Sequence, residues 1–173
     1  MVEALNVDPG ASEPLPWSRA VAQLEELRPA GGRGPPCWLA TARGDGRPHV
    51  TGVVGHWLDD TFYFVSGPST RKARNLAADS RCTVAISLAN LDLVLEGAAR
   101  RVNDEATVAR IAERFSERGW PLTVEGDLLT APFQAPTAPQ PPWHLYALTP
   151  KRALGIGTAG EPGATRWTFP TRD

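Results

Sequence analysis

The chain has 173 residues and a formal net charge of −1, so it is long enough to bury one sizeable hydrophobic core. A near-neutral charge argues against general binding to nucleic acids or to a membrane surface, because both usually require a large basic excess. No run approaches the roughly 18 apolar residues of a membrane span and no basic-then-apolar leader opens the chain, so we expect a soluble, cytoplasmic protein.

The first part of the chain is predicted to contain a tail, a helix and a linker. Residues 1–15 are polar and contain turn-forming residues, so we expect a flexible N-terminal tail. Pro16 is suited to the start of a helix that runs to about Leu27 and has one apolar side. The Pro- and Gly-rich segment 29–36 ends this helix. We expect residues 16–173 to form a single domain.

The remainder is dominated by strand patterns. Apolar or alternating runs predict strands over residues 37–43, 49–58, 61–66, 81–88, 92–102, 143–148, 152–157 and 165–169. Asp45-Gly46 is a strong hairpin signal between the first two of these strands. Gly97 and the two alanines after it indicate a bend in the fifth strand.

Two further helices interrupt the strands. One is predicted over about residues 70–79, and a longer one begins at the capping residue Asp104 and ends at Gly119. Residues 120–142 are Pro-rich and are expected to form an irregular loop within the domain, which is either a lid-like functional segment or poorly ordered. Antiparallel-type strands with short turns, a crossover helix and a long helix predict a mainly β protein, a small barrel decorated by helices.

An unusual charge pattern lies at residues 66–76. Ser69 or Thr70 is a natural N-cap for the short helix, and the helix then opens with Arg71, Lys72 and Arg74. A helix N-terminus already carries partial positive charge, so each cation there costs about 0.3–1 kcal/mol. Backbone N–H groups, hydroxyls and cations that converge on one place are typical of a seat for a phosphate-like anion. The alternative interpretation is a solvated basic face on a surface helix.

Three stretches resemble the N-terminal half of the pyridoxamine 5′-phosphate oxidase-like superfamily, the FMN-binding split barrels. These stretches are WLATARGDGRPHVTGVV (38–54), FYFVSGPSTRKARNLAADSRCTVAI (62–86) and VLEGAARRV (94–102), together about three tenths of the chain. The resemblance implies a split β-barrel, and it implies that the Ser/Thr-Arg-Lys step after the third strand binds the cofactor phosphate. It also implies that the second strand lies along the flavin ring.

Candidate site residues follow from this resemblance and from the basic stretch. We expect the cofactor to contact Pro48, His49, Val50, Thr51, Ser66, Ser69, Thr70, Arg71, Lys72, Asn75 and Trp167. Family members are homodimers with the cofactor between subunits, so Trp167 and Arg166 are expected to close the pocket from the partner chain. No catalytic residue is assigned, because a flavin or deazaflavin carries hydride chemistry at its own ring.

The chain departs from the oxidase itself in two places. Its second strand reads His49-Val50-Thr51 and lacks the oxidase's Arg and Lys pair, and its C-terminus lacks the substrate-binding tail. The resemblance is closer to the flavin/deazaflavin oxidoreductases of the same superfamily. We therefore expect an oxidoreductase that uses FMN, or alternatively coenzyme F-420, on an unidentified small molecule. A non-catalytic carrier or sensor of the cofactor is the alternative from another class, and an empty barrel that serves as an interaction domain is a third.

Two other patterns are set aside. Residues 155–160 match the G-x-G-x-x-G spacing of dinucleotide-binding proteins, but Pro162 breaks the helix that this motif requires, so a turn between two late strands is the better interpretation. The three histidines, His49, His56 and His144, have no metal-binding spacing, so no metal site is expected. His49 is retained as a possible neighbour of the flavin ring.

Overall fold

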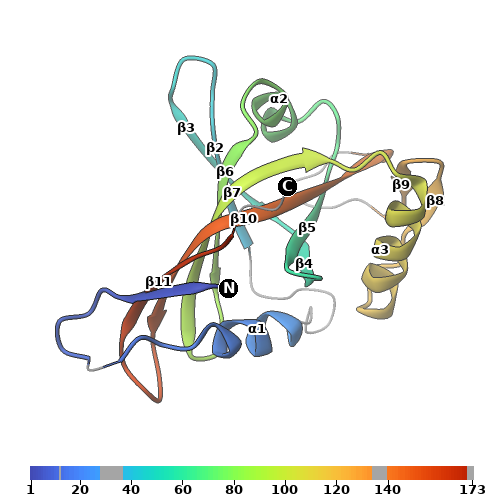
Figure 1. Ribbon diagram of the computed structural model, residues 1–173. Helices are drawn as coiled ribbons and strands as arrows, with labels where there is room; N and C mark the ends of the chain where they lie inside the picture. Colours follow the sequence, from blue (N-terminus) through green and yellow to red (C-terminus); the bar gives the residue numbers. More distant parts are fainter. Residues whose placement is uncertain (12, 28–36, 134–139, 171–173) are drawn as a thin grey trace.

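The computed structural model describes residues 1–173 except 12, 28–36, 134–139 and 171–173 (Figure 1). Within the described residues, an eleven-stranded antiparallel sheet is accompanied by three helices. The helices are α1 (Trp17–Glu25), α2 (Arg71–Ala78) and α3 (Glu105–Glu117). The strands are β1 (Glu3–Asn6), β2 (Cys37–Ala42), β3 (Pro48–Val53), β4 (Gly55–Leu58), β5 (Thr61–Ser66), β6 (Arg81–Ser87), β7 (Leu91–Arg101), β8 (Thr123–Glu125), β9 (Leu128–Thr130), β10 (Trp143–Gly157) and β11 (Ala164–Thr168).

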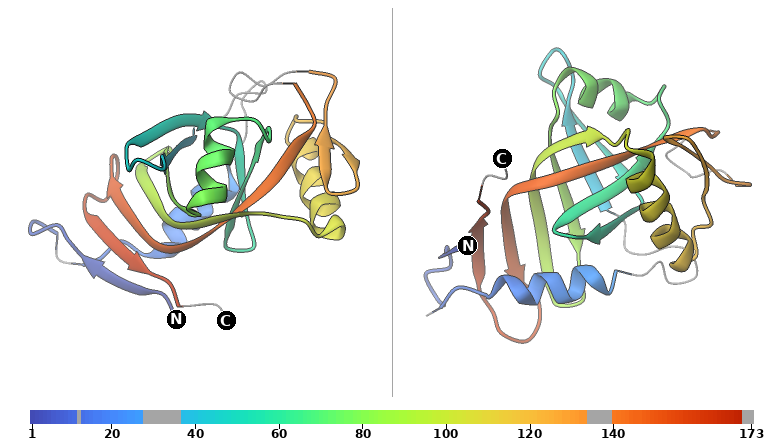
Figure 2. Two further views of the ribbon diagram at one scale, coloured as in Figure 1. Left: turned by 90° about the horizontal axis from the view of Figure 1, so that it is seen from above. Right: turned by 45° about the vertical axis from the view of Figure 1, so that its right-hand side comes forward.

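The long strand β10 organises the sheet. It pairs with β7 along most of its length, with β11 in its C-terminal half and with β5 and β9 in its N-terminal half. The order β1-β11-β10-β7-β6-β2-β3 runs across the sheet, and β4 pairs with β5 outside this path. Figure 2 shows α1 lying across one end of the strands and α3 packed beside the β8–β9 hairpin. This mainly antiparallel sheet with helices confirms the predicted split-barrel fold class.

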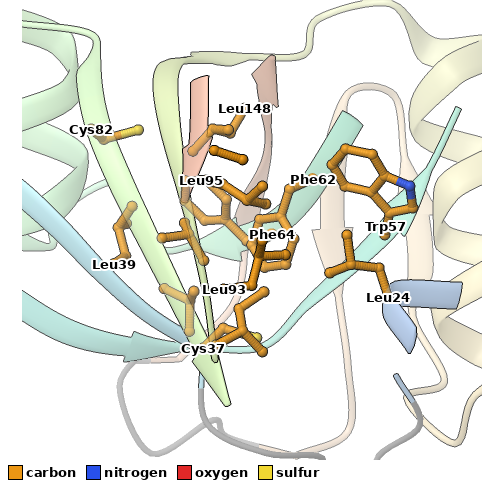
Figure 3. Packing of buried hydrophobic residues seen from close by; sticks show 14 of the residues in the cluster. Leu24, Cys37, Leu39, Trp57, Phe62, Phe64, Cys82, Leu93, Leu95 and Leu148 are labelled. Atoms are coloured by element: carbon orange, nitrogen blue, oxygen red, sulfur yellow. The ribbon is translucent and has the colours of Figure 1, made fainter. Parts of the chain in front are cut away.

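Two hydrophobic clusters form the core. In the larger one, Phe62 and Phe64 of β5 and Trp57 of β4 gather with Leu93 and Leu95 of β7 (Figure 3). The smaller cluster joins α3 to β5, β9 and β10. Burying one such large apolar side chain stabilises a fold by about 1.5–3 kcal/mol. The sheet and all three helices are therefore held in place mainly by these two clusters.

The two late strands predicted at 143–148 and 152–157 form one continuous strand, β10. Its register against β7 shifts between Pro150 and Arg152. Gly97 of β7 lies opposite this shift, and a Cβ atom added there would be 2.2 Å from the carbonyl oxygen of Thr149. The predicted bend around Gly97 is therefore real, and glycine is required because the two backbones approach closely.

Two segments are more ordered than the sequence suggests. The flexible tail predicted over residues 1–15 is wrong, because β1 pairs with β11 and the backbone N–H of Leu15 donates to Thr165 Oγ1 at 2.7 Å. The irregular loop predicted over 120–142 contains the β8–β9 hairpin, which turns at Gly126 with φ of 65°. Residues 134–139 of that loop lie outside the described residues. Short strands such as these carry too few alternating positions to be detected from sequence.

His56 of β4 is a buried histidine beside an arginine. Its ring lies edge-on to Phe115 of α3, with ring centroids 4.3 Å apart, and its Nδ1 is 3.2 Å from a terminal nitrogen of Arg118. Arginine can only donate hydrogen bonds, so Nδ1 accepts and the neutral ring carries its proton on Nε2. Burial, together with the Arg118 charge, lowers the pKa of His56 to about 4.

This histidine makes the stability of the fold depend on pH. The unfolded chain takes up a proton at this residue near pH 6.5, whereas the folded chain does so only near pH 4. Lowering the pH between these values therefore favours unfolding, by up to about 3 kcal/mol. We predict that His56→Leu removes this part of the pH dependence.

The measurement is urea unfolding of both proteins at pH 7 and pH 4.5. His144→Leu is the control, since His144 is only partly buried, and it should keep most of the wild-type slope. Equal losses of stability on acidification in wild type and His56→Leu would contradict the assignment.

None of the described helices is long and apolar enough to cross a membrane.

Candidate functional site

The start of α2 is shaped by two hydroxyl groups. Thr70 caps the helix, since its Oγ1 accepts from the backbone N–H of Ala73 at 3.2 Å. The same hydroxyl donates to the Gly67 carbonyl at 2.9 Å and lies 2.8 Å from Ser66 Oγ. A hydroxyl has one donor and two acceptor positions, so Thr70 is saturated by the chain itself and Ser66 donates to it. Both hydroxyls hold the turn before the helix, and the predicted contact of Ser66 and Thr70 with a cofactor stays a prediction.

A buried hydrogen bond fixes α2 on the β2–β3 hairpin. Asn75 Nδ2 donates to Thr41 Oγ1 at 2.9 Å, and Thr41 lies directly opposite His49 in the β2–β3 register. Arg71 precedes Asn75 by one helical turn and so lies on the same side of the helix. Figure 1 shows α2 beside this hairpin. The docking therefore brings the helix start and His49 together, and Asn75 serves as the anchor.

The result is a cluster of basic groups at the junction of α2 and the hairpin. Burial lowers the pKa of His49, and the charges of Arg43, Lys72 and Arg71 lower it further. Lys72 is only 2% exposed, and burial lowers its pKa as well. Arg43 Nε and His49 Nδ1 are buried and make no hydrogen bond to any described residue. Two buried nitrogens without a partner, in a cluster of basic side chains, fit a bound anion such as a phosphate.

Arg43 was missed by the sequence analysis. It precedes the predicted hairpin turn, where an arginine is normally a solvated surface residue. Its N–H donates to the Arg47 carbonyl at 2.9 Å, which extends the hairpin pairing beyond β2. Arg43 is therefore two places from Thr41 on the same side of the hairpin. The one signal in the sequence that could have indicated Arg43 is the alternation of side chains along a strand, which places residues 41 and 43 on the same side.

Strand β3 presents its predicted residues on two sides. Pro48 and Val50 point to the outer face of the sheet, where Val50 is 57% exposed. His49 and Thr51 alternate with them and lie opposite Thr41 and Leu39 on the inner side. Among the described strands β3 pairs only with β2, so its other edge offers unpaired backbone N–H and C=O groups. The structure thus places His49 with the basic side chains of Arg43, Arg71 and Lys72, while the outer edge of β3 is left without a neighbouring strand among the described ones.

A groove of about 700 Å³ runs over the outer face of the sheet next to this edge. Its floor is a row of residues that face one another on five adjacent strands, namely Ala40, Thr83, Glu96, Arg152 and Thr168. Pro48 lines the same groove. The side chains combine small, hydroxyl and charged groups, so the groove is a mixed surface suited to a polar aromatic ligand or to another protein chain.

The remaining predicted residues lie elsewhere or turn away. Trp167 is fully buried in the main core, and its indole N–H donates to the Leu15 carbonyl at 3.1 Å. The prediction that Trp167 contacts the cofactor is therefore wrong, because a fully buried side chain cannot reach a ligand in a partner chain. Ser69 is exposed, and its carbonyl accepts from the guanidinium of Arg74 at 2.8 Å. The third cation of the stretch is thus directed away from the basic cluster.

Gly155 of the apparent dinucleotide motif has a packing role. It lies within β10, and a Cβ atom there would be 2.6 Å from the indole ring of Trp167. The motif is part of a strand and the turn to β11, as the sequence analysis concluded. No group of three metal-ligating side chains occurs among the residues that the structure describes.

A sequence profile described as pyridoxamine 5′-phosphate oxidase matches residues 23–153. No curated protein matches the chain. A solved pyridoxamine 5′-phosphate oxidase-related, FMN-binding protein from Nostoc punctiforme is 19% identical, with a TM-score of 0.60 over 93% of this chain and 94% of that one.

Two other solved structures are also similar. An F420 reductase is 19% identical, with a TM-score of 0.53 over 76% of this chain and 93% of that one. General Stress Protein 26 from Bacillus anthracis is 12% identical, with a TM-score of 0.56 over 86% of this chain and 96% of that one. At these identities the likeness shows the shared fold. The profile match spans well over half of the sequence, and the chain therefore belongs to the pyridoxamine 5′-phosphate oxidase family.

Proposed function

We propose that the protein is an oxidoreductase that binds FMN and transfers hydride to or from a small molecule. The observation that carries this proposal is the basic cluster at the start of α2, where Arg43 and His49 each bury a nitrogen without a hydrogen-bond partner in the described chain. Two solved proteins of similar fold are named for an FMN-binding function and for F420 reduction, which supports a phosphorylated flavin-type ligand.

Different residues of the chain would bind the phosphate and the ring of such a cofactor. Arg71 and Lys72 would bind its phosphate, helped by the first backbone N–H groups of α2, which have no partner inside the helix. The free edge of β3, residues 48–51, would support the ring by backbone hydrogen bonds. The bound flavin supplies the hydride chemistry at its ring. The chain contributes orientation and positive charge, and a partner subunit would exclude water.

We further propose that the protein is a homodimer with the cofactor between its subunits. Trp38 is 50% exposed on the outer face of β2, although tryptophan is usually well buried. Ala85, Val94 and Leu154 continue this row across β6, β7 and β10, each directly opposite the next. An apolar row across several strands of an open sheet face marks an interaction surface. It runs beside the groove and the β3 edge, so a second copy seated there would cover the ring.

The phosphate assignment predicts the effect of a double substitution. Arg71→Ala with Lys72→Ala should weaken FMN binding by at least about 100-fold, because each charge-assisted hydrogen bond contributes about 1.5–3 kcal/mol. The fold should remain intact, since Arg71 is exposed and α2 is held against the sheet by the buried Ala73 and Leu76. Fluorescence titration of the apoprotein with FMN measures the affinity.

The matched control removes two cations from another surface. Arg110→Ala with Arg114→Ala, both on the exposed side of α3, should leave FMN affinity within about twofold because those side chains pair with Asp59 and Glu117. Unchanged FMN retention in the Arg71/Lys72 variant would remove the basis of the proposal.

The dimer proposal predicts that Trp38→Arg produces a monomer. The exposed position should tolerate arginine at a cost within about 0.5 kcal/mol in the folded monomer, whereas a charge buried at an apolar interface is strongly unfavourable. Sedimentation equilibrium measures the association, and FMN affinity should fall with it. Ala109→Arg, at an exposed position on α3, is the control and should remain dimeric. A Trp38→Arg protein that still dimerises would exclude this face.

A turnover experiment distinguishes an enzyme from a non-catalytic carrier or sensor of the cofactor. If the protein is an enzyme, its reduced cofactor should be reoxidised faster by at least one compound in a panel of acceptors than by air. Reoxidation at the same rate with every acceptor would favour the carrier.

Mass spectrometry of the cofactor released from purified protein distinguishes FMN from F-420. Protein that stays colourless after incubation with both cofactors would favour an interaction domain.

A further inference from the structure

A second cavity, the α2–β7 cavity, lies beneath α2 on the side of the helix that is turned away from Asn75. Its volume is about 500 Å³, and Ala73, Leu76 and Ala77 of α2 line it. Residues 73 and 77 are two positions before and after Asn75, so they lie on nearly the opposite side of the helix from it. Figure 1 shows α2 above the C-terminal part of β7, and the cavity lies between these two elements. It is therefore separate from the basic cluster at the β2–β3 hairpin.

Tyr146 of β10 forms part of the floor of this cavity. Its ring is stacked on Phe64, with ring centroids 5.3 Å apart and 11° between the planes, and only 7% of the residue is exposed. Side chains stand roughly perpendicular to a sheet, so the hydroxyl at the end of this ring is directed toward α2 and the cavity. No described residue forms a hydrogen bond with that hydroxyl. Because a buried tyrosine hydroxyl usually has a partner, Tyr146 indicates a ligand that accepts a hydrogen bond.

Arg101 of β7 is the cation nearest to this hydroxyl in the sheet. It lies directly opposite Tyr146 in the β7–β10 register, and both residues line the cavity. Burial raises the pKa of Tyr146, whereas the Arg101 charge acts in the opposite direction. One terminal nitrogen of Arg101 donates to Asp127, which leaves its other N–H groups for a ligand.

The other charged side chain of the cavity is also an arginine. Arg74 of α2 donates to the Ser69 carbonyl and has no carboxylate partner in the described chain. Arg100 borders the cavity as well, but strand alternation turns its side chain to the other face of the sheet. No Asp or Glu occurs among the described residues that line the cavity. Two guanidinium groups and the adjacent Asp127 give a net charge of about +1, which matches a monoanion.

These groups define the chemistry of the ligand. The Tyr146 hydroxyl and the guanidinium N–H groups are donors, and a carboxylate accepts hydrogen bonds at both oxygens while it carries one negative charge. The alanine and leucine side chains of α2, with Ala99 of β7, provide an apolar wall for the rest of the molecule. Sites for small organic molecules combine such apolar walls with a few polar groups, in volumes of roughly 300–1,000 Å³.

We propose that the α2–β7 cavity binds a small carboxylate with an apolar body. Tyr146 donates to the carboxylate, and Arg74 and Arg101 balance its charge. This site is additional to the proposed flavin site and goes beyond the proposed function. The two sites share α2 but use opposite sides of it, so each can be occupied without the other.

The test uses benzoate as the probe and benzamide as the neutral molecule of the same shape. Binding of each to the full-length protein is measured by calorimetry at pH 7, where a carboxylic acid with a pKa of about 4 is ionised. We expect benzoate to bind at least about 10-fold more tightly than benzamide, because its hydrogen bonds are charge-assisted. The chain has two tyrosines, so in protein labelled with ¹³C at the tyrosine ζ carbon one of two signals should shift with benzoate.

Variants assign the binding to the cavity. Tyr146→Phe keeps the ring on Phe64 and removes only the hydroxyl, so it should weaken benzoate binding by about 10-fold and remove the signal that shifts. Arg74→Gln should weaken benzoate binding by about threefold, a smaller effect because Arg74 is exposed.

Matched controls come from the same residue types elsewhere. Tyr63→Phe alters the other buried tyrosine, which belongs to the smaller hydrophobic cluster. Arg110→Gln removes an exposed cation from α3. Each should leave benzoate affinity within about twofold of wild type.

The outcomes separate this site from the flavin site. Equal affinities for benzoate and benzamide, or unchanged benzoate binding by Tyr146→Phe, would overturn the proposal. The protein with Arg71→Ala and Lys72→Ala should bind benzoate as wild type does, and a loss of binding there would place the anion at the helix start instead of in the cavity. FMN titration of Tyr146→Phe should match wild type, so failure of the carboxylate site leaves the flavin proposal untouched. Benzoate binding at the cavity by a protein that binds no FMN would uphold this inference alone.

Discussion

The hydrogen bond from Asn75 to Thr41 is the contact on which the candidate site depends. It is buried, it joins α2 to a hairpin that is distant in sequence, and it fixes which way the first turn of the helix faces. Together with the packing of Ala73 and Leu76, it places the helix start that carries Arg71 and Lys72 beside the hairpin that carries Arg43. A buried amide and hydroxyl that satisfy each other also keep this junction from rearranging, since breaking the pair would leave both groups unsatisfied.

The core explains why this junction is stable enough to hold mutually repelling charges. Leu76 and Ala73 of α2 are buried in the main cluster with Leu39 and Val84 of the adjacent strands. Apolar burial thus holds the helix against the sheet while its cationic start is oriented by Asn75. Packing elsewhere outweighs the repulsion among the basic groups, and a bound anion, as in the proposed function, would reduce that repulsion.

Much of the fold follows from local pattern, and the site follows only in part. The helix at 70–79, its cap at Thr70 and the strand at 61–66 are encoded by residues next to each other, so the sequence predicts them. Arg43 was not found in this way, because its place beside α2 arises from helix docking, and strand alternation from Thr41 indicates only the side of the hairpin on which it lies. Trp167 illustrates the reverse error, in which a large aromatic near the end of the chain is a core residue held by Leu15 and accommodated by Gly155. The N-terminal strand was missed because four residues carry too little alternation.

The pairing of β1 with β11 bears on how the protein folds during synthesis. These two strands come from opposite ends of the chain, with Glu3 opposite Thr168. Contacts of such long sequence separation form late, because almost the whole chain must be closed into a loop before they are gained. Until β11 has been synthesised, β1 has no partner and the edge of β10 that β11 covers remains open. The outer side of the barrel is thus completed only after β11 has formed, and the growing chain depends on its inner strands to remain folded until then.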